Sequence, residues 1–92
     1  MAKYKGIFKC TILSSKRVIY ENEVQSVFLT GNDGEYELLA CHYPLIGVLA
    51  KGPVVINNKE RIQINGGIAR FFANECIIMI DEQRKPVKAE KK

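Results

Sequence analysis

The segment 66–81, GGIARFFANECIIMID, decides the fold. Two runs rich in Ile and Phe flank the pair Ala73-Asn74. Such residues favour pleated, half-buried surfaces, and Asn tolerates the positive φ that a tight turn demands. The segment therefore predicts a β-hairpin that turns near Ala73-Asn74, in which one of the neighbours Phe71 and Phe72 must face inward.

The residues before this hairpin continue the same pattern. Residues 53–64, PVVINNKERIQI, predict a second hairpin around Asn57-Asn58. Residues 44–52, PLIGVLAKG, are the best candidate for a helical turn, although Gly47 weakens it. No stretch of ten or more residues shows a convincing apolar period of 3.6.

The N-terminal third also predicts strands. Residues 6–13, GIFKCTIL, alternate between apolar and polar positions, as a half-buried strand does. Residues 17–31, RVIYENEVQSVFLTG, read as two strands around Glu21-Asn22. Short strands with turn signals every 8–12 residues are typical of an all-β sandwich or barrel.

The chain length allows one domain, and 47% apolar residues are ordinary for a folded soluble protein. We expect the domain to span residues 1–82, and residues 83–92 to form a basic, flexible tail. No apolar run approaches the roughly 20 residues that span a bilayer. The N-terminus lacks the apolar core of a secretory signal, so we expect a cytosolic chain that contacts a membrane from outside at most.

The net charge of +4 is spread unevenly. Residues 1–17 carry five Lys or Arg and no acid, and residues 82–92 carry five Lys or Arg and two acids. The middle, 18–81, carries four basic and eight acidic residues. Because nucleic-acid-binding proteins concentrate positive charge on their folded surface, this distribution argues against nucleic acid as the partner.

The cysteines and the single histidine provide no metal site. Cys10, Cys41 and Cys76 are far apart and form no CxxC, so zinc has no ligand set. We expect all three thiols to be reduced and in apolar surroundings. Cys41 and His42 are adjacent, and neighbours on a strand point to opposite faces, which disfavours a thiol–imidazole pair.

Three acids, Asp33, Glu35 and Glu37, share a parity and face one way on an extended chain. This arrangement favours a solvent-exposed acidic face over a catalytic acid/base pair. His42 reads either as a core histidine or as a polar tip held by the turn before Pro44. The serines lack a G-x-S-x-G setting, and the Gly-rich turns lack a Walker or dinucleotide pattern. We expect no catalytic residue, no cofactor and no metal.

At residues 27–56 the sequence resembles a known family, the N-terminal domain of the F-type ATP synthase epsilon subunit. Members of that family tend to read G-x-x-G-E-x-G-x-L-P-G-H-x-P-L, then L-x-x-G-x-V. Residues 10–27 and 64–81 resemble the family's opening and closing strands. The matching positions here are Gly31, Gly34, Glu35, Leu39, His42, Pro44, Leu45, Leu49, Gly52 and Val54.

The resemblance implies a flattened antiparallel β-sandwich of about ten short strands and a non-catalytic role in the rotor. In the family this domain bridges the gamma subunit and the polar loops of the membrane c-ring. It couples their rotation to ATP synthesis and hydrolysis. The partner-binding residues carried over to this chain are Gly31, Asp33, Gly34, Glu35, Glu37 and His42.

The resemblance also implies a place in the cell. Members of the family lie on the cytoplasmic side of the bacterial inner membrane or at the equivalent place on the chloroplast thylakoid. For this chain we expect the bacterial location. Family members contact the membrane only through the complex.

The sequence departs from the family pattern at three places. Glu37 stands where the family has Gly, and Ala40-Cys41 replaces Pro-Gly. Without that Gly, the turn that aims His42 lacks a residue that adopts positive φ freely. The third departure is that no C-terminal helical hairpin follows, so we expect either a short form or a piece of a longer protein, without self-inhibition by that hairpin.

A second hypothesis remains open beside the rotor subunit. A free-standing β-sandwich or OB-like module could use its basic ends to bind an acidic partner such as RNA. Such binding needs exposed aromatic side chains beside Lys or Arg, and Phe71 and Phe72 next to Arg70 are the only local candidates.

Overall fold

The computed structural model describes residues 6–81, which form nine strands and no helix. The prediction of an all-β domain is therefore confirmed. The basic tail predicted for residues 83–92 lies outside the described residues. The strands are β1 (Phe8–Leu13), β2 (Val18–Val24), β3 (Ser26–Gly31), β4 (Gly34–Leu39), β5 (Leu45–Leu49), β6 (Gly52–Ile56), β7 (Glu60–Ile64), β8 (Gly67–Phe72) and β9 (Glu75–Ile80).

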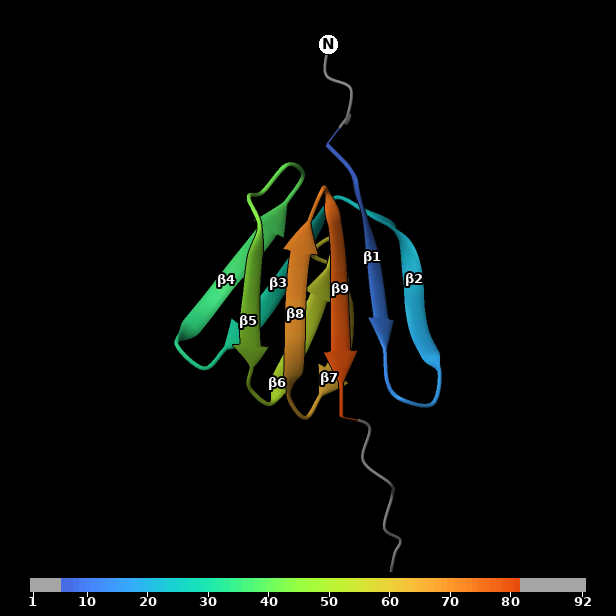
Figure 1. The fold of residues 1–92 in the computed structure, drawn as a ribbon, viewed down its shortest axis with the longest axis vertical. Coiled ribbons are helices and arrows are strands. Elements are labelled where there is room, and N and C mark those ends of the chain that lie inside the picture. Colours follow the sequence, from blue (N-terminus) through green and yellow to red (C-terminus); the bar gives the residue numbers. More distant parts are fainter. Residues whose placement is uncertain (1–5, 82–92) are drawn as a thin grey trace, which may run out of the picture.

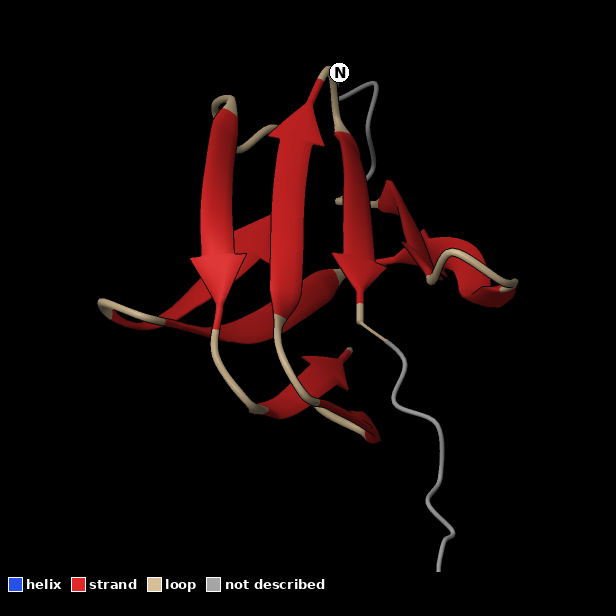
Figure 2. Ribbon diagram, turned by 60° about the horizontal axis from the view of Figure 1, so that its bottom comes forward, coloured by secondary structure: helices blue, strands red, loops and turns tan. Residues whose placement is uncertain are grey.

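The strands form one curled sheet that folds into two layers (Figures 1 and 2). The front layer has the order β2-β1-β9-β8-β5, and the back layer consists of β4, β3, β6 and β7. The layers join where Gly31 of β3 pairs with Leu49 of β5. Two loop hydrogen bonds support this joint: the Asn32 amide donates to the Val48 carbonyl at 3.2 Å, and the Ala50 amide donates to the Thr30 carbonyl at 2.9 Å.

One strand pair departs from the expected antiparallel arrangement. The strands β1 and β9 run parallel, whereas the other pairs are antiparallel. A parallel pair needs a long connection between its strands, and here all the intervening strands provide it. The first and last described strands thus lie side by side in the middle of the front layer (Figure 1).

The core lies between the two layers. On β1 and β8 the buried residues alternate with outward ones, as the pleat requires. Phe71 is completely buried, and its ring meets that of Phe8 edge-on with centroids 5.3 Å apart. The buried apolar residues are Phe8, Cys10, Ile12, Val24, Val27, Leu29, Leu38, Leu49, Val54, Ile56, Ile64, Ala69, Phe71, Cys76 and Ile78.

Both predicted hairpin turns are confirmed. Asn57 and Asn58 have φ of 55° and 58°, and Ala73 and Asn74 have φ of 52° and 60°. Two adjacent residues with positive φ give the twist that a tight hairpin needs. The strands on either side pair in register, with Ile56 opposite Glu60 in the first hairpin.

The division predicted at Glu21-Asn22 is wrong, because β2 runs unbroken through both residues and ends at Val24. The corner lies one residue later, at Gln25. The side-chain oxygen of Asn57 accepts hydrogen bonds there from the Gln25 amide at 2.6 Å and the Ser26 amide at 3.2 Å. The corner is therefore set by a residue about thirty positions away, which local patterns cannot reveal.

Residues 44–52, the best candidate for a helical turn in the sequence, contain none, because Leu45–Leu49 form β5. The strand pairs with β8 along its whole length. Gly47 lies at its centre, and a Cβ there would lie 2.9 Å from the hydroxyl of Tyr36, so a larger residue would push the end of the Tyr36 side chain aside. The glycine that weakens a helix thus lets the two layers approach each other.

The cysteines meet the prediction in part. Cys10 and Cys76 are buried and lie opposite each other in the parallel pair, whereas Cys41 is exposed. A hydrogen bond with Cys10, together with burial, raises the pKa of the Cys76 thiol. Cys41 is exposed because it lies in the turn after β4 rather than on a strand.

Asn74 connects three segments at one end of the molecule. Its side-chain oxygen accepts a hydrogen bond from the Cys41 amide at 2.7 Å, and its side-chain amide donates to the Ile7 carbonyl at 3.1 Å. It therefore ties the β8–β9 turn to the β4–β5 connection and to the residue that precedes β1. Cys41 itself has φ of 66°, so Asn74 holds in place a turn that lacks the favourable glycine.

The two neighbouring phenylalanines of β8 provide a matched test of the core. Phe71→Ala should lower the free energy of unfolding by about 3–5 kcal/mol, because it empties a fully buried site. Phe72→Ala removes the same atoms from a side chain that is 58% exposed and should cost less than about 1 kcal/mol. Urea unfolding of both variants measures the difference, and similar losses would contradict the assigned strand register.

The role of Asn74 can be separated from its backbone conformation. Asn74→Gly keeps the positive φ but removes both side-chain hydrogen bonds, so stability should fall by about 1–2 kcal/mol. Amide hydrogen exchange at Cys41 should become faster in this variant. Unchanged exchange at Cys41 would show that Asn74 does not hold that turn, and Asn58→Gly serves as a control at a comparable turn position.

Candidate functional site

The structure separates the six predicted partner-binding residues into two groups. Gly31, Asp33, Gly34, Glu35 and Glu37 lie on the β3–β4 hairpin, and His42 follows the far end of β4. Since β4 has six residues, the hairpin tip and His42 lie about 20 Å apart at the usual rise per residue. Figure 1 shows the β3–β4 turn at the lower left and the β4–β5 connection at the top. Glu35 and His42 therefore do not form one contact loop.

The hairpin tip presents acidic side chains to solvent. Gly31 pairs with Gly34 across the two-residue turn Asn32-Asp33, and Gly34 has φ of 135°, which favours glycine. Asp33, Glu35 and Glu37 are all exposed. No described Lys or Arg forms an ion pair with these carboxylates, since the ion pair of residues 6–81 joins Lys9 and Glu21. The hairpin is thus an open acidic surface.

A groove runs beside this hairpin, between the open edges of β4 and β5. It has a volume of about 600 Å³ and is lined by residues 31–36 and 45–48. Tyr36 reaches from β4 toward Gly47 of β5, and its buried hydroxyl has no hydrogen-bond partner among the described residues. Burial raises the pKa of Tyr36. The ring therefore fills the space between the layers without contributing a polar contact.

His42 is attached to the core rather than directed at solvent. Its ring meets Phe71 edge-on with centroids 5.6 Å apart and lies 5.4 Å from the ring of Tyr43. Its Nδ1–H donates to the carbonyl oxygen of Tyr43 at 2.7 Å, and its backbone amide donates to the Leu39 carbonyl at 3.2 Å. His42 is half-buried, so it combines features of both roles that the sequence left open.

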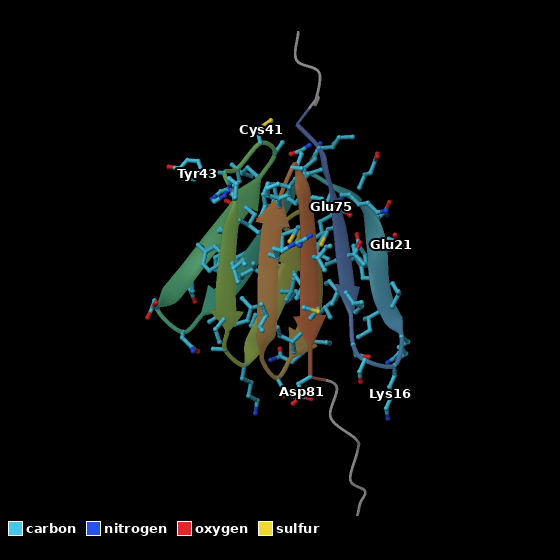
Figure 3. All side chains as sticks on the ribbon, in the orientation of Figure 1. Lys16, Glu21, Cys41, Tyr43, Glu75 and Asp81 are labelled. Carbon is cyan, nitrogen blue, oxygen red and sulfur yellow. The ribbon has the colours of Figure 1, made fainter. Side chains whose placement is uncertain are left out.

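The described residues offer no constellation for catalysis or metal binding. Cys41 lies at the end of the molecule with its sulfur directed outward (Figure 3), and His42 turns toward Phe71. No group of three or more His, Cys, Asp or Glu residues within 6–81 could hold a metal ion.

Sequence reasoning missed a second surface, the outer face of β5, β8 and β9, which faces the viewer in Figure 1. Five large apolar side chains are exposed there, and Ile46 is the most open at 73%. The signal was available: both alternating sets of residues in β5 are apolar, and in β9 Glu75 is the one charged residue, so each strand has a largely apolar outer face as well as an apolar inner one. We call this the outer apolar face; its members are Ile46, Val48, Ile68, Phe72 and Met79.

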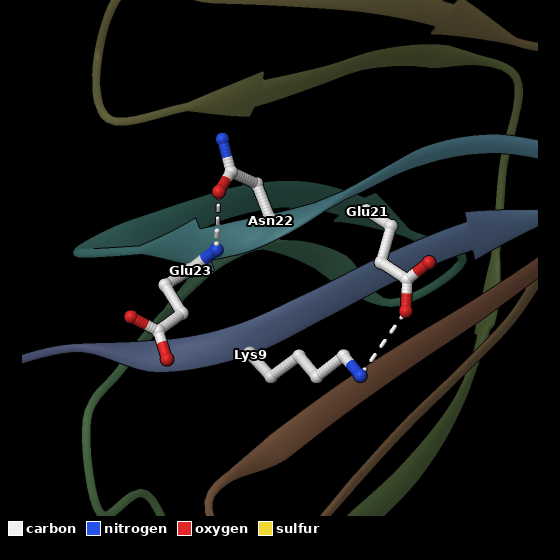
Figure 4. Close-up of polar contacts among 4 residues, drawn as sticks. All are labelled: Lys9, Glu21, Asn22 and Glu23. Carbon is white, nitrogen blue, oxygen red and sulfur yellow. Dashed lines mark hydrogen bonds and ion pairs between the residues drawn. The ribbon is translucent and has the colours of Figure 1, made fainter.

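The opposite edge of the front layer is polar. Lys9 of β1 and Glu21 of β2 form an ion pair at 3.1 Å with both side chains about half exposed (Figure 4). The hydrogen bond to Glu21 raises the pKa of Lys9, and the side chain of Asn22 accepts from the Glu23 amide at 2.9 Å. Charged residues on an edge strand discourage pairing with another sheet, so β2 is an unsuitable docking edge.

The chain matches a family model described as ATP synthase, Delta/Epsilon chain, beta-sandwich domain, over residues 7–85. It is 30% identical to an ATP synthase epsilon chain of Psychrobacter sp., covering 91% of this chain and 70% of that protein. It is 28% identical to the epsilon chain of Chlorobium limicola, covering 89% of this chain and 98% of that protein. The chloroplastic epsilon chain of Pisum sativum is 30% identical, and 57% of its length is covered.

Solved structures with the same fold belong to mitochondrial ATP synthases. A chain of the Euglena gracilis OSCP/F1/c-ring structure superposes with a TM-score of 0.75 at 22% identity, over 88% of this chain and 54% of that one. A chain of the Tetrahymena thermophila central stalk/c-ring structure gives a TM-score of 0.66 at 15% identity, over 80% and 63% of the two chains. With the family model matching nearly all described residues, this chain belongs to the ATP synthase delta/epsilon β-sandwich family.

Proposed function

We propose that this chain is a non-catalytic subunit of the central stalk of an F-type ATP synthase. It bridges the gamma subunit and the polar loops of the membrane c-ring, and it couples their rotation to ATP synthesis and hydrolysis. Family membership supports this proposal. The observation that carries it is the presence of two exposed surfaces of different chemistry, the outer apolar face and the acidic hairpin, on one small sandwich.

The outer apolar face suits the gamma subunit. Large contiguous apolar patches are rare on monomeric proteins and mark protein contacts. Here the apolar side chains come from three adjacent strands that pair in register, with Val48 opposite Ile68 and Ile68 opposite Met79. A face of this kind gains free energy when a partner removes it from water, which favours a contact that persists through rotation.

The acidic hairpin suits basic groups on the loops of the c-ring. Asp33, Glu35 and Glu37 are open to solvent, so they can steer a positively charged partner and set its register. Within residues 6–81, His42 has no contact with this surface and instead packs its ring on Phe71, next to the connection that follows β4. The part of the chain that the structure describes includes no helix able to cross a membrane, and we propose a peripheral position on the cytoplasmic side of a bacterial membrane.

The RNA-binding alternative is less well supported. Residues 6–81 contain seven Lys or Arg against eight Asp or Glu, so the described surface lacks the positive excess that nucleic acid requires. Phe72 is exposed beside Arg70, but the side chains opposite them on the neighbouring strands are Ile46, Ile77 and the acidic Glu75, none of which is basic. That environment is typical of a protein interface.

Charge reversal at Glu35 tests the assignment of the two surfaces. Glu35→Lys should weaken retention of the chain on c-ring-containing membranes at least about fivefold at low salt, because it places like charges together. Binding to the isolated gamma subunit should stay within about twofold of wild type. Quantitative pull-downs against both partners measure the two effects.

The control for this experiment is Glu23→Lys, which makes the same charge change on the exposed strand β2. It should leave binding to both partners unchanged. Equal loss of ring and gamma binding by Glu35→Lys would show that the hairpin does not contact the ring separately. If neither partner is retained by the wild-type chain from native membranes, the rotor assignment itself is wrong.

A further inference from the structure

Arg70 occupies the centre of the outer apolar face. It is an exposed residue in the middle of β8, with Ile46 opposite it on β5 and Ile77 opposite it on β9. Along β8 its neighbours on the same face are Ile68 and Phe72. A guanidinium is thus surrounded by apolar side chains on all four sides of the sheet surface.

Arg70 has no ion-pair partner within the part of the chain that the structure describes. The nearest acid of this face by register is Glu75, which stands opposite Phe72 on β9 and diagonally from Arg70. Glu75 also stands opposite Lys9 of β1, and its charge contributes to the raised pKa of Lys9. No carboxylate of residues 6–81 lies within 4 Å of the Arg70 guanidinium, so its donors remain available.

A hollow adjoins the guanidinium. It has a volume of about 550 Å³ and is lined by Pro44, Leu45, Ile46, Arg70, Phe71 and Phe72. Apart from Arg70, the side chains that line it are apolar. A hollow of this size accommodates a large aliphatic or aromatic side chain of a partner, with its neighbouring polar group held above the rim.

A partner that covers this face must satisfy Arg70. Burying an unpaired guanidinium under apolar surface is strongly unfavourable, whereas a carboxylate matches its planar fork through two parallel hydrogen bonds. Arginine and aromatic residues are also enriched at the centres of protein interfaces, where charges other than arginine are depleted. A partner surface that is only apolar would therefore be rejected, which gives the face specificity as well as affinity.

We infer that the partner segment docking on the outer apolar face carries a carboxylate that pairs with Arg70, next to a large apolar side chain that fills the hollow between Ile46 and Phe72. The inference rests on the proposed function, because it takes the gamma subunit as that partner. It adds the chemistry of the contact: an acidic residue of gamma, flanked by apolar residues, lies against the centre of β8. The occupant is a protein segment rather than a phosphate group, since the walls of the hollow are apolar.

Titration of the purified gamma subunit with variants of the full chain tests the inference. Arg70→Met keeps the length and apolar stem of the side chain but removes its charge, and it should raise the Kd for gamma at least about 30-fold. Arg70→Lys keeps the charge but loses the fork, and it should raise the Kd about three- to tenfold. The matched control is Arg61→Met on β7 in the back layer, which should leave the Kd unchanged. Thermal unfolding of each variant verifies that the sandwich is intact.

A charge swap then identifies the acid. The variant Arg70→Glu is combined in turn with gamma subunits in which one Asp or Glu is changed to Lys. One of these gamma variants should bind Arg70→Glu at least about tenfold more tightly than wild-type gamma does. Wild-type affinity of Arg70→Met, together with weakened binding by Phe72→Ala, would overturn the inference while leaving the face as the gamma contact. Absence of gamma binding by the wild-type chain would instead overturn the proposed function, and the inference with it.

Discussion

The packing of Phe71 between the two layers is the constraint on which the rest of the structure depends. Its ring contacts Phe8 of β1 and His42 after β4, so one side chain joins the N-terminal strand, the central strand and the connection between the layers. Because side chains alternate on a strand, placing Phe71 inward turns Arg70 and Phe72 outward. The same register that closes the core therefore creates the outer apolar face.

The fold keeps the acidic hairpin apart from His42 by the length of one strand, while the outer apolar face borders the groove beside the hairpin through Ile46 and Val48. The hairpin tip lies at one end of β4, and His42 with the Asn74 contacts lies at the other. Pairing of β3 with β4, β5 and β6 fixes the hairpin to both layers. In the function proposed above, this pairing lets the domain hold two partners at a constant separation, which a rotor that turns as one unit requires.

Local patterns were sufficient for β1 and for the two Asn-containing hairpins, since alternation and turn residues are properties of neighbouring residues. They were insufficient where distant residues decide. From the sequence Gly47 indicates only a weakened helix, whereas in the structure it lies in a strand next to the Tyr36 side chain. The corner at Gln25 depends on a hydrogen bond to Asn57. Likewise, the positive φ of Cys41 is stabilised by Asn74, which lies in a different turn. The residues of the candidate site were named from the sequence. Their separation into the hairpin and His42 became visible only in the structure, where β4 lies between them.

The central claim is that two separate surfaces of this sandwich contact two different partners. Side-chain footprinting of the chain, free and in the assembled complex, tests it most directly, with hydroxyl radicals for Phe72 and Met79 and carbodiimide labelling for carboxylates. The account predicts that Phe72, Met79 and Glu35 become protected, whereas Glu21 and Glu23 on β2 remain reactive. Protection of β2, or continued reactivity of Phe72 and Met79 in the complex, would contradict it.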